Sequence, residues 1–540
     1  MRKLLLILAL SGLAALVWIV FQQAWVYPET RLLPYYALWT LLRLGITYII
    51  CLTFGLAMGI LAATRERIGN WLIPLLDILQ SVPVLGFFPL ALAVIIQAFH
   101  ESTFGLELAS MFLLFTSMEW SIVFGVITGI KSMPPYIVDM RRVFHIEGWD
   151  YVKHILLPSV YPYVVAGSML AWGSGWYFVI ITEFITFGDK VYSLPGLGYY
   201  LNKASFVYGS IWMSLAGLIV IGAIVFLMNR FIWHRLSERA GEYQFLALHG
   251  FRPREFKGES FRLKQVRYIT SRLEVIHRVR LPFWHLVVFS VRRRRYIFAA
   301  LGLVALVAGV FYAWTKIPIS LVELEHIATA TAFSMSRLTV AYLVALALAV
   351  GLGLLILRLP AIKNFILILA DIMQSIPALA YFPILFTVFT KVFPERVGME
   401  ITAVLLMLTG MLWYLVFNVL ETVEHWPREI NELAGLFDIR GTKYLRDMLV
   451  PGLFPALISG SILAWGGGWN ATIVSEYVNI GHKEHVIPGL GSSLDLASNA
   501  GDTHKLLVLL GIMVVIVVVL NHFVWRPLLN RASTHVLEET

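Results

Sequence analysis

The sequence predicts an all-α integral membrane protein with about 12 transmembrane helices, arranged as two tandem repeats of six. Composition is the first observation behind this prediction: 59% of the 540 residues are hydrophobic and only 14% are charged, whereas soluble domains carry roughly 25% charged residues. The second is that apolar stretches long enough to cross a bilayer recur along the whole chain. The third is an internal duplication, in which the same short phrases return after 293 or 294 residues.

A helix needs about 20 mostly apolar residues to cross the hydrocarbon core of a membrane. The longest spans are expected to tilt, kink or extend beyond the lipid. The first span follows the residues MRK, so a cleaved signal peptide is the alternative to a retained helix. A retained helix is expected, because the stretch is long for a signal peptide and shows no small-x-small cleavage site. The predicted spans are 4–26, 37–63, 72–99, 108–130, 155–181, 210–232, 296–314, 327–357, 365–390, 401–420, 449–475 and 505–525.

The distribution of Lys and Arg predicts the orientation in the membrane. If the N-terminus lies in the cytoplasm and the chain crosses at every span, most basic residues fall on the cytoplasmic side. This bias matches the positive-inside rule, which short loops report best. TRER at 64–67, RRVF at 141–144 and RGTK at 440–443 agree with the assignment. Both termini are therefore expected in the cytoplasm.

The predicted domains are a first repeat at 1–235, a basic cytoplasmic linker at 236–292 and a second repeat at 293–540. The run RRRR at 292–295 directly precedes a predicted span. The linker is expected to anchor the topology and to be attracted to anionic membrane lipid, at about 1 kcal/mol for each basic residue near the surface. Nucleic-acid binding is the alternative that this charge raises, and it is not expected. LPFWHLVVF at 281–289 is a candidate to lie along the membrane interface.

The two repeats share phrases that occur in the same order in both. Because each repeat has an even number of predicted spans, the copies run parallel through the membrane, and two such units can pair about an axis along the membrane normal. A duplicated scaffold without transport activity is the alternative interpretation. The matching phrases are DILQSVP (77–83) and DIMQSIP (371–377), WGSGW (172–176) and WGGGW (465–469), and PGLG (195–198) and PGLG (488–491).

The first repeated phrase places polar residues beside a proline inside an apolar span. Proline removes a backbone hydrogen bond and kinks a helix, and such a feature is tolerated where it faces protein or a water-filled cavity. These residues are therefore candidates to line a translocation path, with a purely structural kink as the alternative. They are Gln80, Ser81 and Pro83 in the first repeat, and Gln374, Ser375 and Pro377 in the second.

The second repeated phrase places small residues between two tryptophans in the fifth span of each repeat. Glycines inside a helix permit close helix approach or local unwinding beside a cavity. We list Trp172, Trp176, Trp465 and Trp469 as candidate path residues, because they lie in mid-span rather than at the interface where tryptophan is common. Asn470 also belongs to this set; it breaks the symmetry, because Tyr177 stands at the matching position.

An acidic residue follows each tryptophan pair by two helical turns, at Glu183 and Glu476. An acid within a membrane span is a functional candidate by default. Arg43 and Arg337, near the outer end of the second span of each repeat, are natural ion-pair partners for these acids. Contact with the solute and pairing with an arginine remain open as alternatives, and attraction of an anionic solute by the arginines is a third.

The cytoplasmic loop after the fourth span has the same pattern in both repeats. It reads DMRRVFHIEGWDYVKHILLP at 139–158 and ELAGLFDIRGTKYLRDMLVP at 432–451. Each copy begins with an acid, continues through a short amphipathic stretch, turns near a glycine and enters an apolar span through a proline, a residue that suits the start of a helix. A loop this long and patterned is more than a connection. It predicts a short exposed helix that docks onto another protein.

These loops resemble the EAA loop of bacterial ATP-binding cassette (ABC) importer permeases of type I. Glu432, Leu433 and Ala434 stand on the Glu-Ala-Ala of that pattern, and Asp139, Met140 and Arg141 stand on it in the first repeat. Both repeats depart from the pattern at its glycine, where His145 and Asp438 stand; Gly148 and Gly441, three residues later, are expected to take over the turn. The acid late in the fifth span followed by GLG is nearest to the permeases for nitrate, sulfonate, taurine and bicarbonate.

The resemblance implies partners that this chain does not contain. Two copies of an ABC ATPase subunit would carry ATP and Mg and act on the loops, and a periplasmic or lipid-anchored solute-binding protein would deliver the solute. The chain has no G-x-x-x-x-G-K-[ST] phosphate loop, so no cofactor is expected in the chain itself. The expected docking residues are Phe144, His145, Ile146, Glu147, Gly148 and Trp149, with Phe437, Asp438, Ile439, Arg440, Gly441 and Thr442; the two phenylalanines are the apolar anchors.

The resulting expectation is the fused transmembrane subunit of an importer in the bacterial inner membrane. It would move a small solute, an oxyanion such as nitrate, a sulfonate, taurine or bicarbonate, by alternating access. A secondary transporter or channel that works without an ATPase is the alternative. The single cysteine, Cys51, excludes an internal disulfide and a Cys-rich metal site. An enzyme is not expected, because the chain lacks HExxH, any Cys/His cluster and a convincing Ser-His-Asp arrangement.

Overall fold

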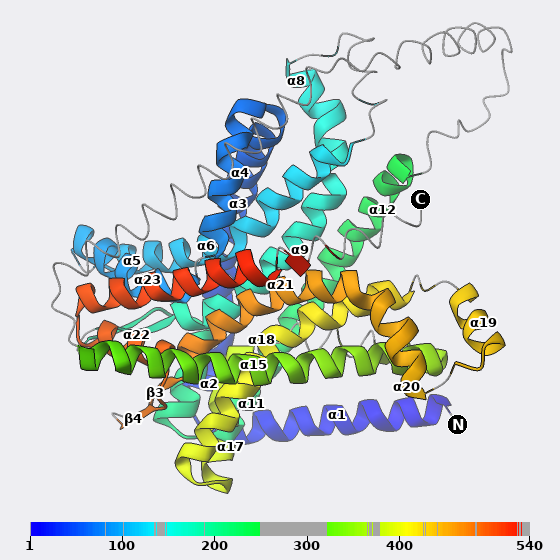
Figure 1. The fold of residues 1–540 in the computed structure, drawn as a ribbon. Helices are drawn as coiled ribbons and strands as arrows, with labels where there is room; N and C mark the ends of the chain where they lie inside the picture. The colour runs from blue at the N-terminus through cyan, green and yellow to red at the C-terminus, as the bar shows by residue number, and fades with distance from the viewer. Residues whose placement is uncertain are drawn as a thin grey trace, which may run out of the picture.

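The computed structural model places most of both predicted repeats (Figure 1). The structure describes residues 2–81, 83–100, 102–133, 148–187, 190–248, 321–363, 378–424, 428–439, 441–480 and 483–525, with a few isolated positions between them. The predicted linker at 236–292 lies largely outside these ranges. The predicted end of the first repeat at 235 falls inside a helix that continues to Leu248.

The first repeat is built from long apolar helices with one β-hairpin on its outer side. Its elements are α1 (Arg2–Ala24), α2 (Pro28–Arg31), α3 (Leu33–Thr64), α4 (Glu66–Ser81), α5 (Val84–Ala98), α6 (Thr103–Lys131), α8 (Gly148–Tyr151), η1 (Val152–Leu156), α9 (Leu157–Thr182), β1 (Phe184–Phe187), β2 (Lys190–Ser193), α10 (Leu197–Asn202), η2 (Lys203–Val207), α11 (Ile211–Met228), η3 (Asn229–Trp233) and α12 (His234–Leu248).

The second repeat follows the same order. Its elements are α15 (Leu321–Arg358), η5 (Pro360–Ile362), α17 (Ala378–Val392), α18 (Glu395–Glu424), α19 (Arg428–Leu436), α20 (Gly441–Tyr444), η6 (Leu445–Leu449), α21 (Val450–Ser475), β3 (Tyr477–Ile480), β4 (Lys483–Val486), α22 (Leu490–Asn499), α23 (Thr503–Leu520) and η7 (Asn521–Trp525). Equivalent pairs include α3 with α15, α5 with α17, α6 with α18 and α9 with α21.

The expected count of 12 spans is not confirmed. In the described part of the chain, eight helices are long and apolar enough to cross a membrane. The predicted span 296–314 lies outside the described residues. Apolar stretches in α1 and α17 are shorter, at Ala14–Ala24 and Ala378–Val392.

The predicted span 72–99 is wrong as one helix, because the chain breaks it into α4 and α5 at Pro83. Pro83 lacks an N–H and has extended backbone angles (φ −60°, ψ 120°), which make it the residue before the first turn of α5. The DILQSVP phrase therefore marks a true helix break. Its counterpart at 371–377 lies outside the described residues.

Proline does not begin the fifth span of either repeat, contrary to expectation. The helix is continuous from Gly148 to Thr182 in the first repeat and from Gly441 to Ser475 in the second. One wide π turn precedes each proline: Leu157 N donates to Val152 O, and Val450 N donates to Leu445 O. A proline cannot donate to the preceding turn and its ring crowds the carbonyl there, so the wider turn relieves the conflict.

Two antiparallel hairpins interrupt the helical architecture, and the sequence analysis did not predict them. β1 pairs with β2 in the register Phe184 to Ser193, and β3 pairs with β4 in the register Tyr477 to Val486. Each hairpin directly follows α9 or α21 and leads to a Pro-Gly-Leu-Gly turn. It therefore sits at the same end of the repeat as the acidic residue that closes the helix.

One helix of each repeat contacts both repeats: α5 packs against α6 of its own repeat and α17 against α18 of its own, and each also packs against the other repeat. α5 of the first repeat packs against α21, α22 and α23 of the second, and α17 of the second packs against α9, α10 and α11 of the first. Figure 1 shows α5 alongside α23 and α17 alongside α11. This reciprocal packing joins the repeats through their own secondary structure rather than through the linker.

Candidate functional site

Each repeat closes the end that is expected to face outward with an arginine held by two glutamates, which we call the outer arginine cluster. In the first repeat Arg43 Nη1 lies 2.5 Å from Glu183 Oε1, and its Nε and Nη2 lie 2.7 and 2.8 Å from the two oxygens of Glu107. The arginine stands on α3, and the glutamates stand on α6 and at the end of α9. The cluster therefore ties three helices of one repeat together.

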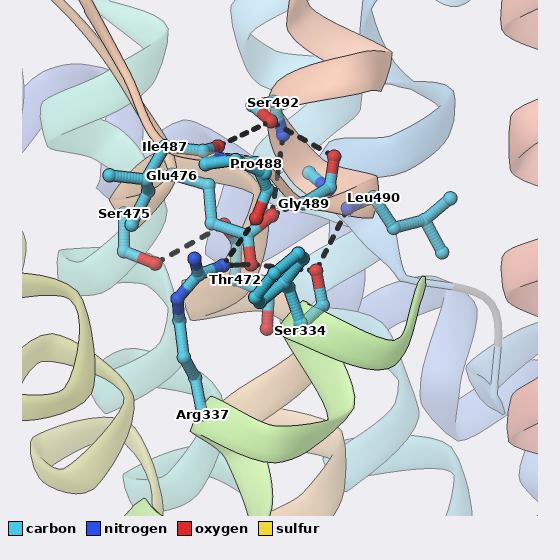
Figure 2. Close-up of polar contacts among 12 residues, drawn as sticks. Ser334, Arg337, Thr472, Ser475, Glu476, Ile487, Pro488, Gly489, Leu490 and Ser492 are labelled. Atoms are coloured by element: carbon cyan, nitrogen blue, oxygen red, sulfur yellow. Dashed lines mark hydrogen bonds and ion pairs between the residues drawn. The ribbon is translucent and has the colours of Figure 1, made fainter. Parts of the chain in front are cut away.

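The second repeat reproduces the cluster with the same residue types at the matching places; Figure 2 shows Arg337 and Glu476 beside Ser334. Arg337 Nη1 lies 2.8 Å from Glu476 Oε1, and its Nε and Nη2 lie 2.6 and 2.7 Å from the oxygens of Glu400. Arg337 Nη1 also donates to the Pro488 carbonyl at 2.8 Å. Repetition in both halves indicates a part of the architecture rather than an accident of one helix pair.

The buried glutamates accept further hydrogen bonds, so that both carboxylate oxygens are occupied. Glu183 accepts from Thr40 Oγ1 and Gly198 N, both at 2.6 Å. Glu476 accepts from Ser334 Oγ at 2.6 Å and Gly491 N at 2.8 Å. Hydrogen bonds of this kind compensate a buried charge.

The Pro-Gly-Leu-Gly turns owe their glycines to these carboxylates. A Cβ on Gly196 would overlap the Glu183 carboxylate, and a Cβ on Gly489 would overlap that of Glu476. The turn thus brings its backbone close enough for the glycine two residues later to donate to the carboxylate. This explains why the sequence repeats an acid followed by GLG.

In this structure the arginines and the late acids are paired with each other. Arg43 and Glu183 are 1% and 0% exposed, and Arg337 and Glu476 are 4% and 0% exposed. The sequence analysis missed the other members of the clusters, Glu107, Glu400, Thr40 and Ser334. A signal was present, because Glu107 and Glu400 are 293 residues apart and Thr40 and Ser334 are 294 apart.

The candidate path tryptophans lie within the packing of their own repeat. Trp172 meets Tyr48 edge-on at 5.5 Å between ring centroids and lies 6.1 Å from Trp233. Trp465 contacts Tyr342 and Trp525 in the same way. Trp176 and Trp469 are almost fully buried. The glycines between them do not unwind the helix.

Close approach is what these glycines provide. A Cβ on Gly467 would overlap the carbonyl oxygen of Gly410 on α18, and a Cβ on Gly468 would lie 2.8 Å from Leu338 on α15. In the first repeat a Cβ on Gly175 would lie 2.9 Å from both Leu44 and Met118. The small residues therefore let α21 and α9 pack tightly in their bundles.

Polar residues do meet between the repeats. Asn470 on α21 accepts from Leu85 N, in the first turn of α5, at 3.5 Å, and its Nδ2 donates to Gly466 O at 3.1 Å. It thereby caps a helix of the other repeat, next to the break at Pro83. Gln80, at the end of α4, is exposed; the side chain of Ser81 and residues Gln374, Ser375 and Pro377 are outside the described part.

At the position matching Asn470, the first repeat carries Tyr177. Tyr177 lies on α9, which packs against α17. Its ionisable neighbours are Tyr381 on α17 and Tyr414 on α18. These phenols form what we call the interface tyrosine group. On the outer side of the interface, α22 carries Asp495, whose pKa is raised well above its usual range by burial and by repulsion from Glu476.

The loop after the fourth predicted span of the second repeat forms the expected exposed helix. α19 ends at Leu436, and the side chains of Leu436 and Phe437 are 80% and 71% exposed. The turn that follows contains Asp438 with φ 50° and Gly441 with φ 60°. The left-handed angle of Asp438 explains the glycine that the EAA pattern has there.

The first cytoplasmic loop is described only near its end. Gly148 has φ 60°, as Gly441 does, and Trp149 is 71% exposed. Ile146 is half-buried, whereas Phe144, His145 and Glu147 lie outside the described residues. In the second loop Arg440 also lies outside them, and Ile439 and Thr442 follow the turn.

The described residues hold no group of three or more His, Cys, Asp or Glu arranged to bind a metal ion. His485 lies 2.5 Å from Glu395 as a separate pair. The arrangement as a whole offers two ion-paired outer clusters, a polar seam between the repeats and exposed loop helices.

Comparison with known proteins gives the same family signal in both repeats. The family model described as "Binding-protein-dependent transport system inner membrane component" matches residues 55–238 and 344–532. These two matches leave out the predicted linker and correspond to the two copies of the architecture.

Each of three curated relatives matches about a third of the chain. The chain is 26% identical over 200 residues to the nitrate import permease protein NrtB of Leptolyngbya laminosa, covering 36% of this chain and 67% of that protein. It is 26% identical over 195 residues to the bicarbonate transport system permease protein CmpB of Synechococcus elongatus (36% and 64%) and 24% identical over 198 residues to the putative aliphatic sulfonates transport permease protein SsuC of Bacillus subtilis (36% and 65%). The matches span about half to two thirds of the length of these relatives.

Proposed function

The chain belongs to the family of binding-protein-dependent transport system inner membrane components, the type I permeases of ABC importers, and carries two copies of its domain. It is a multi-pass inner-membrane protein of that family. On this premise we propose that the chain is the complete transmembrane part of an importer that moves a small oxyanion into the cytoplasm. The observation that carries the proposal is the reciprocal packing of two like repeats, in which α5 contacts the second repeat and α17 contacts the first.

This packing supports alternating access. Two rigid bundles that each pack one helix against the other can rock about the interface between them. This motion opens the interface to one side of the membrane at a time. The outer arginine clusters keep each bundle rigid, because each joins three helices by charged hydrogen bonds. We place the path along the seam, near Gln80, Ser81, Pro83 and Asn470 and near the matching Gln374, Ser375 and Pro377.

Two copies of an ATPase subunit would bind ATP and Mg, dock on the cytoplasmic loops and supply the energy for transport. The exposed Phe437 and Leu436 support this role, because exposed apolar anchors are typical of interface hot spots. The helix that starts at Gly441 continues without a break into the membrane, so a push on the loop is carried to α21. The same holds for Gly148 and α9.

The solute would be delivered by a periplasmic or lipid-anchored binding protein. An oxyanion is supported by the printed names of relatives that import nitrate, bicarbonate and sulfonates. In this arrangement both chain termini and the basic linker lie in the cytoplasm, where the linker meets anionic lipid.

The test is co-purification of the ATPase with a variant in the second loop. Phe437→Asp should weaken the complex by about 30-fold or more, as expected for loss of a buried aromatic anchor worth at least about 2 kcal/mol. Phe104→Asp is the matched control, because Phe104 is 65% exposed at the opposite end of the bundle and should leave the complex intact.

Two results would contradict the proposal. One is an ATPase that binds the Phe437→Asp variant as tightly as the native chain. The other is proton-driven uptake by this chain alone in liposomes without ATP, which would favour a secondary transporter.

A further inference from the structure

The hydroxyl of Tyr177 is enclosed in the protein and has no hydrogen-bond partner within the described part of the chain. Phenylalanine would fill the same space without leaving a buried donor unpaired, so the hydroxyl lowers the stability of this conformation. An unpaired buried polar group of this kind calls for an explanation, and a ligand that is absent from the structure is one.

The surroundings of Tyr177 place its hydroxyl at the seam between the repeats. Its helix, α9, packs on α17 of the second repeat, and its ionisable neighbours Tyr381 and Tyr414 both belong to that repeat. Tyr381 is already hydrogen-bonded with Thr409. Tyr177 is therefore a donor that faces the other bundle and is not used by it.

The matching position in the second repeat differs in this respect. Asn470 donates to Gly466 O and accepts from Leu85 N, so both its polar atoms have partners. At this pair of matching positions, the unpaired donor therefore belongs to the first repeat.

Among the described residues, the helices α5, α9, α17 and α21 carry almost none of the cations that could bind an oxyanion. Helices α5, α9 and α21 contain no Lys or Arg, and α17 contains one, Lys391, in its last turn. Arg43 and Arg337 are held in the outer clusters by two carboxylates each. Recognition between the bundles must therefore rely on neutral donors, and weak binding of that kind lets a solute leave again.

We propose that the Tyr177 hydroxyl donates a hydrogen bond to an oxygen of the solute as it passes between the repeats, which makes Tyr177 a residue that determines specificity for oxyanions. This inference rests on the proposed function and names a contact within it. In the conformation described here the seam is closed around the hydroxyl, and the contact forms when the bundles part.

The experiment measures ATP-driven uptake by the full transporter, with its ATPase and binding protein, in proteoliposomes. The probes are labelled nitrate, bicarbonate and ethanesulfonate. Tyr177→Phe should lower kcat/KM for the transported probe by about tenfold, which corresponds to one lost hydrogen bond. Its melting temperature should be unchanged or higher, because the unpaired donor is gone.

Tyr200→Phe is the matched control. It removes a buried hydroxyl that is partnered, 3.1 Å from Thr30 Oγ1, and should lower the melting temperature while changing uptake by less than about twofold. Tyr177→Asn copies the residue of the other repeat and provides a second variant that is expected to fold.

If both Tyr177 variants transport the probe as well as the native chain does, the inference is overturned while the proposed function stands. If the native transporter shows no ATP-driven uptake of any probe, the proposed function fails and takes the inference with it. Lower uptake in Tyr177→Phe together with an unchanged or raised melting temperature supports the contact.

Discussion

Arg337 is the residue on which the outer end of the second repeat depends. Replacing it with methionine leaves the buried Glu476 carboxylate without its cation and beside Glu400. Breaking a buried ion pair from one side costs about 3–5 kcal/mol. We expect Arg337→Met to lower the melting temperature in detergent strongly, as measured by thermal unfolding.

Arg358→Met is the control for that experiment, because Arg358 is exposed at the end of α15. It should change the free energy of unfolding by no more than about 0.5 kcal/mol. Equal losses in the two variants would mean that the cluster does not stabilise the fold.

Glu119 on α6 is the opposite case, because it is a buried acid whose carboxylate is not expected to stabilise the fold. It is 1% exposed, and neither carboxylate oxygen has a hydrogen-bond partner among the described residues; the thiol of Cys51 is its polar neighbour. The second repeat has Leu412 at the matching place, 293 residues on. We expect Glu119→Leu to raise the free energy of unfolding by about 1–3 kcal/mol, because a buried unsatisfied group is removed.

The control for Glu119 is Glu119→Gln, which keeps the polar group and should give a much smaller gain in melting temperature. A loss of stability in Glu119→Leu would show that the carboxyl has a partner in the folded protein.

Sequence reasoning at the residue scale found half of each cluster. The arginines and late acids stand out because charge inside an apolar span is costly. Glu107 and Glu400 escaped because they stand near helix starts, where an acid is ordinary.

At the scale of elements, the WGGGW run tests how tightly α21 packs. A Cβ on Gly467 would overlap the Gly410 carbonyl, whereas a Cβ on Gly466 would meet nothing within 4 Å. Gly467→Ala should therefore lower the melting temperature clearly, because a backbone clash must be relieved by moving α21 away from α18. Gly466→Ala, one residue away, should be neutral or stabilising by up to about 1 kcal/mol.

If the two alanine variants melt at the same temperature, the close approach of α21 and α18 is not what this run of glycines provides. The comparison is informative because both substitutions add one methyl group to the same helix.

The elements that the sequence predicted best are the long apolar helices, whose length alone identifies them. The helix break at Pro83 was predicted as a bend within one span, because a proline marks the place but not the angle. The two hairpins were missed because strands of four residues leave too short an alternation to separate from a loop. The π turns before Pro158 and Pro451 depend on the continuity of two helices, which a proline in the sequence argues against.

At the scale of the whole molecule, the packing of α5 on the second repeat and of α17 on the first predicts that the repeats associate without the linker. Two halves of the chain, separated within the linker and co-expressed, should co-purify because each packs a helix against the other. Gly86→Phe should abolish this, since a Cβ there already lies 2.9 Å from Leu510 and 3.7 Å from Met513 of the second repeat.

Gly222→Phe on α11 is the matched change, because a Cβ there meets nothing within 4 Å; the halves should still co-purify. Halves that never associate, even without substitution, would contradict this packing. The internal duplication predicted a paired arrangement of repeats, but which helix contacts the other repeat depends on contacts between residues hundreds of positions apart, and no local pattern encodes those.

The packing of α5 against the second repeat also has a consequence for biogenesis. α5 ends at Ala98, and the first of its partner helices in the second repeat begins at Val450, about 350 residues later. At a synthesis rate of about 5–20 residues per second, roughly 20–70 s pass between the synthesis of α5 and the synthesis of this partner helix. During that interval the face of α5 that later packs against the second repeat is exposed to lipid. Insertases or membrane proteases can act on the nascent chain at this stage.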